Sequence, residues 1–253
     1  FEPVGMKTAV YDMPQPIIPR RVAGYSQSPN GYVNAEYVGM TQPYAAGSLA
    51  ATVYDLAAWD NALYSEKLLK QETLALAYES VTLNDGSLFH YGFGWGFHAY
   101  EGHRLISHSG GIHGFATHAI RELTTQTFVV VLTNNDSKSP ELLALKLMAE
   151  ALGKPLRAPE PIPVANEILQ SYIGLFKINE ALSRKIFYET GNLFSQLGEQ
   201  PPIELIPVAE HRFVMVNNIL AKLQFVLDEN GRIVAIEQYY HDHLANRAEK
   251  VTA

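Results

Sequence analysis

The sequence predicts an α+β body, an antiparallel sheet with flanking helices, followed by a small all-β antiparallel barrel. The first observation is a series of short apolar runs between residues 90 and 134, rich in aromatic and β-branched residues and separated by turn-like segments. Such runs are typical of strands. The second observation is that apolar residues recur at helical spacing before residue 90 and after residue 134. The third is a change after a proline-rich stretch, beyond which only short apolar runs recur, as in a small barrel or sandwich.

Three helices are predicted in the first body. Thr52 can cap a helix that runs to about Leu63, and Asp55 stands three residues later as its capping-box partner. The other two helices are expected over about 70–79 and 140–152. All three have apolar residues near one face, and those of the helix over 140–152 are expected to cover one face of the sheet.

Four strands are predicted for the sheet, over about 90–99, 103–109, 114–121 and 126–134. Residues 1–44 contain many prolines, glycines, tyrosines and asparagines and show little periodicity. Proline excludes a regular helix from such a segment. We therefore expect irregular chain that is wrapped over the sheet.

The second body follows a linker, which four prolines predict over residues 153–163. The predicted domains are thus 1–152 and 164–253. Two turns of hairpin type, Thr190-Gly191-Asn192 and Asn230-Gly231, support an antiparallel arrangement in the second domain. Seven apolar runs recur there: Gly174–Ile178, Lys185–Glu189, Leu193–Gln196, Glu204–Val208, Phe213–Val216, Leu223–Leu227 and Ile233–Gln238.

Composition excludes several classes of function. The chain has 253 residues, of which 47% are hydrophobic and 18% charged, as in a globular protein. The net charge of −7 and the absence of a basic cluster argue against nucleic acid as a partner. No apolar run approaches the ~20 residues of a membrane span. The absence of cysteine excludes disulfides and thiolate catalysis.

The candidate site is the segment His108-Ser109-Gly110-Gly111, which lies where the second predicted strand should end. Two glycines beside a hydroxyl and an imidazole allow another molecule to approach the backbone closely, because no Cβ stands in the way. The segment predicts a binding site at one end of the sheet.

The order of four motifs resembles the serine β-lactamase and penicillin-binding protein group, with the class C-like branch closest. Relatives of that branch include D-amino-acid peptidases and esterases. The second domain is similar to the lipocalin-like accessory domain that often follows such hydrolase domains. The motifs are Phe1-Glu-Pro-Val-Gly-Met6 with Thr8, Ala45-Ala-Gly-Ser-Leu49 with Asp55-Leu56, Tyr91-Gly-Phe-Gly-Trp95, and His108-Ser-Gly-Gly111.

The resemblance implies roles for the candidate site. His108-Ser109-Gly110 matches the Lys-Thr-Gly triplet on the sheet strand that faces the nucleophile. His108 would then orient the substrate, Ser109 would bind a substrate carboxylate or carbonyl, and the N–H of Gly111 would be one oxyanion donor. The implied reaction is amide or ester hydrolysis through an acyl-serine, on a small-molecule or peptide substrate and without a cofactor.

The nucleophile of that group is missing from this sequence. It is the serine of a Ser-x-x-Lys motif, but no lysine here has serine or threonine three residues before it. The group's Tyr-x-Asn motif has a literal match at Tyr32-Val-Asn34. In the group that motif precedes the Phe-x-Pro-x-Gly-Met segment, whereas here it follows, so we interpret residues 32–34 as an irregular loop.

Other chemistry is less well supported. Five histidines recur every five residues, a period that fits neither a strand face nor a helix face, so they do not predict a metal site. His241-Asp-His243 has the residue types for weak metal binding, but we expect it to decorate a barrel rim. Ser109 is not in a Gly-x-Ser-x-Gly elbow. As its neighbour in a strand, His108 would point to the opposite face and could not take its proton.

We therefore interpret the chain as the C-terminal part of a class C-like serine hydrolase domain with its accessory domain, inactive alone. Because Phe1 is not a methionine, we expect a longer parent protein, with any targeting segment upstream. The resemblance implies an extracytoplasmic location, and uncovered core surface would favour self-association. The rival hypothesis is a non-catalytic binding module, whose barrel holds an apolar ligand or a partner peptide.

Overall fold

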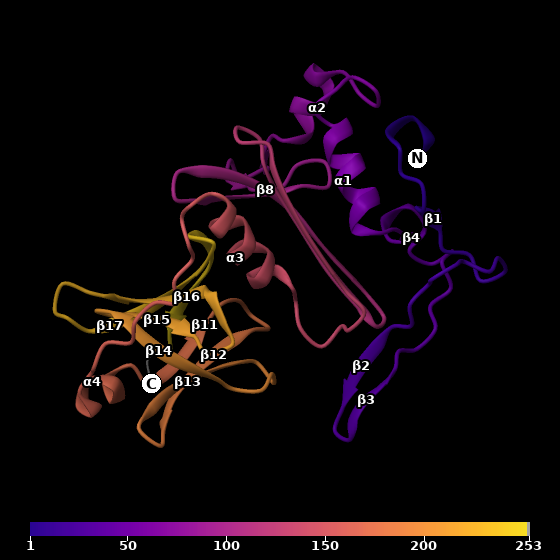
Figure 1. The fold of residues 1–253 in the computed structure, drawn as a ribbon. Helices are drawn as coiled ribbons and strands as arrows, with labels where there is room; N and C mark the ends of the chain where they lie inside the picture. Colours follow the sequence, from indigo (N-terminus) through magenta and orange to yellow (C-terminus); the bar gives the residue numbers. More distant parts are fainter. Residues whose placement is uncertain (252–253) are drawn as a thin grey trace. The chain divides into compact units, whose positions relative to one another are not determined.

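A computed structural model describes residues 1–251 of the chain. The fold divides into two compact units, Phe1–Leu156 and a second unit that begins at Arg157. Figure 1 shows an α+β first unit and an antiparallel barrel as the second, which confirms the predicted fold class. No helix within residues 1–251 is long and apolar enough to cross a membrane.

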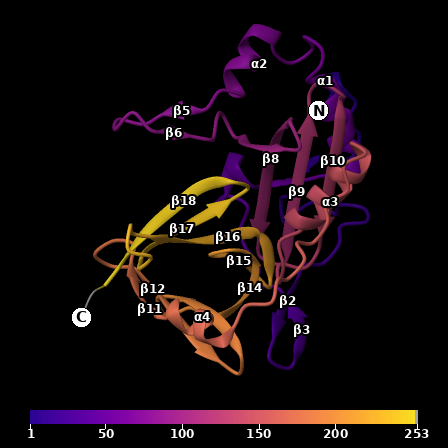
Figure 2. The same ribbon diagram turned by 90° about the vertical axis from the view of Figure 1, so that its left-hand side faces the viewer.

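A four-stranded antiparallel sheet forms the centre of the first unit. Its strands are β7 (Gly96–Tyr100), β8 (His103–Ile112), β9 (Phe115–Glu122) and β10 (Thr127–Thr133). They lie in the order β10-β9-β8-β7, and Figure 2 shows β8, β9 and β10 side by side. Each strand pairs with the next along the chain, so short turns suffice to connect them.

Three short strand pairs lie outside this sheet. The strands β1 (Val10–Tyr11) and β4 (Leu49–Ala50) form one pair, and β5 (Val81–Thr82) and β6 (Leu88–Phe89) form another. The third is a hairpin of β2 and β3. In this hairpin, β2 spans Tyr25–Ser28 and β3 spans Gly31–Asn34. The 3-10 helices η1 and η2 span Glu2–Val4 and Tyr44–Ala46.

The helix α1 (Val53–Ala62) begins with the predicted capping box. Thr52 Oγ1 accepts a hydrogen bond from Asp55 N, and Asp55 accepts one from Thr52 N at 3.0 Å. The backbone N–H and the hydroxyl of Thr8 also donate to the Asp55 carboxylate. Burial opposes ionisation of Asp55, but these hydrogen bonds prevail and hold its pKa well below the usual value. Asp55 therefore fixes the N-terminal segment to α1.

One face of the sheet packs against α1 and α2 (Gln71–Ala77). The apolar cluster on this face is Leu63, Leu74, Ala77, Tyr78, Trp95, Phe97 and Ile106. A buried ion pair lies beside it, with Arg121 Nε of β9 at 3.0 Å from Asp60 Oδ1 of α1. Arg121 also donates to the Tyr78 hydroxyl at 2.5 Å, so the strand, α1 and the end of α2 are tied together.

The other face of the sheet packs against α3 (Glu141–Ala151), which contacts β9 and β10. Figure 1 shows α1 and α3 on opposite sides of the strands. The helix buries four small or flexible apolar side chains: Ala144, Leu145, Met148 and Ala149. The sheet is thus covered on both faces over much of its length.

The second unit is a closed barrel of eight antiparallel strands, preceded by α4 (Asn166–Ser171). Leu169 and Tyr172, within and just after α4, join the apolar core of the barrel. The strands are β11 (Gly174–Lys177), β12 (Ser183–Glu189), β13 (Asn192–Leu197), β14 (Ile203–Ala209), β15 (Arg212–Met215), β16 (Asn218–Leu227), β17 (Ile233–Tyr240) and β18 (His243–Lys250).

Several predicted elements differ in the structure. The strand expected over 90–99 begins only at Gly96, because Gly92 and Gly94 shape a turn before it. Residues 32–34 belong to the β2–β3 hairpin rather than to an irregular loop, so the segment 1–44 is not wholly irregular. The barrel has an eighth strand, β18, which the seven apolar runs did not include.

Candidate functional site

The segment His108-Ser109-Gly110-Gly111 lies in the second half of β8, and all four residues are exposed. The strand was expected to end at Ser109, but it continues to Ile112. It continues because β9 supplies partners throughout, with Gly110 opposite Thr117 and Gly111 opposite Ala116. Leu105 and Ile106 in the first half of β8 are completely buried. The exposed half is therefore the uncovered part of a strand whose buried residues are 105–107.

His108 has a defined partner. Its Nε2 lies 2.8 Å from the hydroxyl of Tyr91, and the two ring centroids are 5.9 Å apart. Alternation along β8 places His108 on the face of Ile106, which is the face that α1 and α2 cover farther along the strand. The hydrogen bond thus connects the turn before β7 to the exposed half of β8.

Sequence reasoning missed this role of Tyr91. The stretch Tyr91–Trp95 was singled out as a motif, but it was interpreted as part of a strand. In the structure it is a turn, and an isolated bridge pairs Tyr91 with Gly96. The two glycines at 92 and 94 could have predicted this turn, because glycine is typical of turns. Nothing in the spacing predicts that the tyrosine hydroxyl reaches a residue seventeen positions later.

Ser109 lies on the opposite face of the sheet from His108, as the alternation of a strand requires. Its backbone partner on β9 is His118. The Nε2 atom of His108 is hydrogen-bonded to the Tyr91 hydroxyl on the other face of the sheet. His108 therefore cannot act as a base that takes the proton of Ser109. The arrangement suits Ser109 for hydrogen bonding rather than for nucleophilic attack.

Glycine at position 110 leaves room for a side chain of the neighbouring strand. A Cβ at this position would overlap Oγ1 of Thr117, the residue opposite it on β9. A Cβ at Gly111 would meet no atom within 4 Å, so the space beside Gly111 is open. The two glycines thus differ: one makes room for a neighbouring side chain, and the other leaves its backbone accessible.

The turn that follows the segment is held firmly. Gly114, with φ of 78°, donates from its N–H to Asp136 Oδ2 at 2.8 Å. Ser26 Oγ donates to the same oxygen at 2.7 Å. The hydrogen bonds from Ser26 and Gly114 lower the pKa of Asp136. Asp136 thereby fixes the β8–β9 turn to the start of the β2–β3 hairpin.

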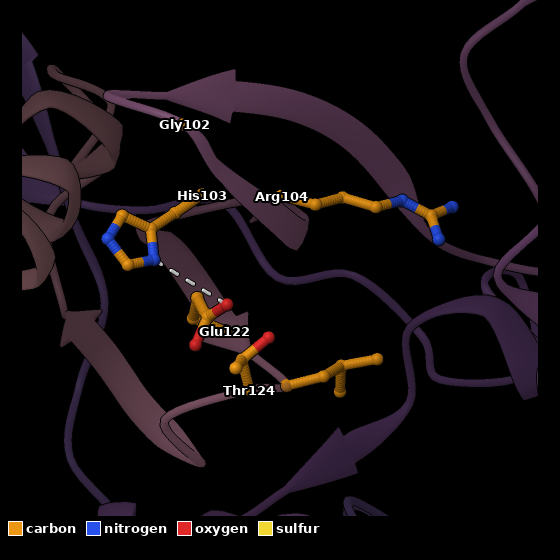
Figure 3. Close-up of a pocket in the computed structure, with 6 residues that line it drawn as sticks. Gly102, His103, Arg104, Glu122 and Thr124 are labelled. Atoms are coloured by element: carbon orange, nitrogen blue, oxygen red, sulfur yellow. Dashed lines mark ion pairs between the residues drawn. The ribbon is translucent and has the colours of Figure 1, made fainter.

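A pocket lies at the other end of β8, with a volume of about 460 Å³. Figure 3 shows His103 and Glu122 facing each other there, with His103 Nδ1 at 3.7 Å from Glu122 Oε1. Burial opposes ionisation of Glu122, but hydrogen bonds from Thr125 and Thr124 lower its pKa. The lining residues are Gly102, His103, Arg104, Glu122, Leu123 and Thr124. None of them belongs to the predicted site.

The regularly spaced histidines do not gather around one point. His98 and His118 are buried in the sheet, whereas His108 and His113 are exposed. Within residues 1–251, no group of three His, Asp or Glu side chains is arranged to hold a metal ion.

Comparison with known proteins places this site in context. The family model described as Beta-lactamase matches residues 1–153. Penicillin-binding protein 4* of Bacillus subtilis (strain 168) is 27% identical over 194 residues, which cover 73% of this chain and 43% of that protein. The D-aminopeptidase of Gluconobacter oxydans (strain 621H) is 26% identical over 238 residues, which cover 94% of this chain and 41% of that protein.

Solved structures show the same fold at low identity. The octameric penicillin-binding protein homologue from Pyrococcus abyssi superposes with a TM-score of 0.57 and 19% identity, over 98% of this chain and 58% of that one. A D-stereospecific amidohydrolase from Streptomyces sp. superposes with a TM-score of 0.50 and 21% identity, over 60% of this chain and 46% of that one.

The chain spans less than half the length of the two curated relatives. The matched residues 1–153 are more than half of this chain and contain β8 and the whole candidate site. Through these residues the chain belongs to the Beta-lactamase family.

Proposed function

We propose that this chain carries the substrate-binding side of a class C-like serine hydrolase of the β-lactamase and penicillin-binding protein group. The supporting observation is the position of His108-Ser109-Gly110-Gly111. The segment lies within the family match, on an exposed stretch of a central sheet strand, and Tyr91 holds its histidine. The substrate is an amide or ester: a serine attacks its carbonyl and releases the amine or alcohol, and water then hydrolyses the acyl-serine to release the acid.

Each residue of the segment has a proposed role. His108, oriented by Tyr91, sets the position and the local electrostatics of the substrate. Ser109 donates a hydrogen bond to a substrate carboxylate or carbonyl. The N–H of Gly111 contributes to the oxyanion hole, since open space beside its Cα lets a substrate come close. Gly110 lets the strand pair with β9 beside Thr117.

The nucleophile is proposed to come from a Ser-x-x-Lys segment outside this sequence. No lysine in the 253 residues has serine or threonine three positions before it. The two curated relatives are more than twice as long as the matched part, which leaves room for such a segment in a longer parent. The chain alone is accordingly expected to be inactive, because an acyl intermediate needs an activated hydroxyl.

The relatives suggest the substrate class. One is named a D-aminopeptidase, and a solved structure with the same fold is titled a D-stereospecific amidohydrolase. We propose amides or peptides of D-amino acids as substrates. We also propose domain bounds of 1–152, 153–163 and 164–253, with a lipocalin-like accessory domain as the last. Residues 252 and 253 lie outside the described part of the chain.

The test compares two proteins: this chain, and the longer product of the same gene with its upstream coding segment. Both are incubated with D-phenylalanine p-nitroanilide and with a fluorescent penicillin. The longer protein should turn over the amide or carry the label on an upstream serine, and His108→Ala should reduce either reaction at least tenfold. A longer protein without Ser-x-x-Lys, or one whose activity is unchanged by His108→Ala, would refute the proposal.

A further inference from the structure

A row of aromatic rings leads away from the candidate site. The imidazole of His108 lies beside Tyr91, with ring centroids 5.9 Å apart. Tyr91 in turn lies beside Phe89, with ring centroids 6.2 Å apart and ring planes tilted by 46°. Both separations fall in the range in which aromatic rings attract each other. The first ring of this row belongs to the candidate site, whereas the last has no part in the function proposed so far.

The edge of β8 beside this row is open. The pairing of β7 with β8 ends at Gly96 opposite Ser107. From His108 to Ile112, the only strand that pairs with β8 within residues 1–251 is β9. An isolated bridge to Gly96 places Tyr91 next to the open edge. A substrate at the exposed half of β8 can therefore reach the row without displacing a strand.

Phe89 supplies the exposed apolar surface of the row. It is 56% exposed, although its ring is apolar. No Asp, Glu, Lys or Arg occurs between Leu88 and Phe97 in the sequence. The surface around Phe89 thus offers ring contacts and apolar area rather than ion pairs, and it suits an uncharged apolar group of a ligand.

The backbone fixes this row in place. Phe89 pairs with Val81 in the β5–β6 ladder, and Figure 2 shows these two strands projecting from the first unit. The carbonyl of Phe89 accepts a hydrogen bond from Tyr91 N at 2.7 Å. A Cβ at Gly92 would overlap the carbonyl oxygen of Ala77 in α2, so the chain after Tyr91 packs directly on that helix. A surface that is already ordered costs little entropy when a ligand binds.

We propose that Phe89 and Tyr91 form a subsite for an aromatic side chain of the substrate. The reacting amide lies at Ser109 and Gly111, and the substrate side chain follows the row from His108 and packs its ring against Phe89. An aromatic ring gains edge-to-face contacts there that a saturated ring of equal size lacks. This inference rests on the proposed function, and it narrows the substrates from D-amino acid amides to those with aromatic side chains.

The test is an NMR titration of the full chain, which follows the imidazole signals of His108. The probes are the amides of D-phenylalanine, D-cyclohexylalanine and D-alanine. D-Phenylalanine amide should bind about threefold more tightly than D-cyclohexylalanine amide and about tenfold more tightly than D-alanine amide. Equal affinities for the first two probes would overturn the assignment to aromatic side chains. If no probe shifts the His108 signals, the binding role proposed for residues 108–111 is wrong, and the subsite is wrong with it.

Variants locate the aromatic contact. Phe89→Ala should weaken the binding of D-phenylalanine amide about tenfold and leave that of D-alanine amide unchanged. Phe89→Leu keeps an apolar side chain on β6 and should lose only the preference over D-cyclohexylalanine amide. Phe93→Ala is the matched control, because Phe93 is 72% exposed in the adjacent turn and lies outside the row. Equal loss in Phe93→Ala, or unchanged selectivity in Phe89→Ala, would overturn the subsite and leave the proposed function standing.

Discussion

Tyr91 Oη lies 2.8 Å from Nε2 of His108, and this contact joins the turn before β7 to the exposed half of β8. It gives the candidate site a fixed imidazole in an otherwise uncovered stretch of strand. The ring orientation of a histidine is set by such a partner, so a residue outside the matched triplet helps to shape the site.

Tyr91→Phe removes this hydrogen bond and keeps the aromatic ring. We expect the ¹⁵N chemical shift of His108 Nε2 to change in the variant, because its hydrogen-bond partner is lost. Tyr100→Phe is the control, since the Tyr100 hydroxyl donates to the carbonyl of Lys154 instead. An imidazole spectrum of His108 that is identical in Tyr91→Phe and the wild type would show that the contact does not persist in solution.

Gly110→Ala should destabilise the first unit by about 1–3 kcal/mol, because the new Cβ overlaps Thr117 Oγ1. Adding Thr117→Ala should recover most of that loss, since it removes the overlapping atom. Gly111→Ala faces open space and should be close to neutral. Urea unfolding of the four proteins measures this, and equal effects of the two glycine substitutions would contradict the packing described.

The free energy of unfolding of the first unit should fall as the pH rises from about 4 to about 6, because the buried Asp60 carboxyl ionises over this range. Burial raises its pKa from 3.8 to about 6, although Arg121 partly offsets the shift. A group with a raised folded pKa stabilises the fold fully below its unfolded pKa, and this contribution is lost as the pH passes the folded value. The loss is at most about 3 kcal/mol. Asp60→Asn should lack this slope, and an unchanged slope would assign it to another group.

Asp55 should act in the opposite direction. Its pKa is held down, so its contribution to stability is present above about pH 4 and is lost as the pH falls below that value. Thr8→Val removes a hydroxyl that donates to this carboxylate and should cost about 1.5–3 kcal/mol at neutral pH. Thr82→Val, at an exposed position of β5, is the control. Equal stability of the two variants would show that Thr8 does not hold α1.

The capping box at Thr52 and the strand pairs of the sheet were predictable because they depend on local sequence and short turns. The barrel strand β18 was missed because its sequence is mostly polar, and it contributes Ala248 as its one fully buried side chain. Pairing with β17 and β11 makes it a strand. The Tyr91–His108 contact was unpredictable because it depends on tertiary placement of a turn.

The most direct test of the account is intact-mass analysis of the purified chain after incubation with penicillin and with an active-site phosphonate. Without Ser-x-x-Lys, and with His108 and Ser109 on opposite faces of β8, the chain should remain unlabelled. Turnover of a chromogenic cephalosporin and of a p-nitrophenyl ester should stay at background. Stoichiometric labelling, or turnover that Ser109→Ala abolishes, would contradict the account, because it would show that this chain carries its own nucleophile.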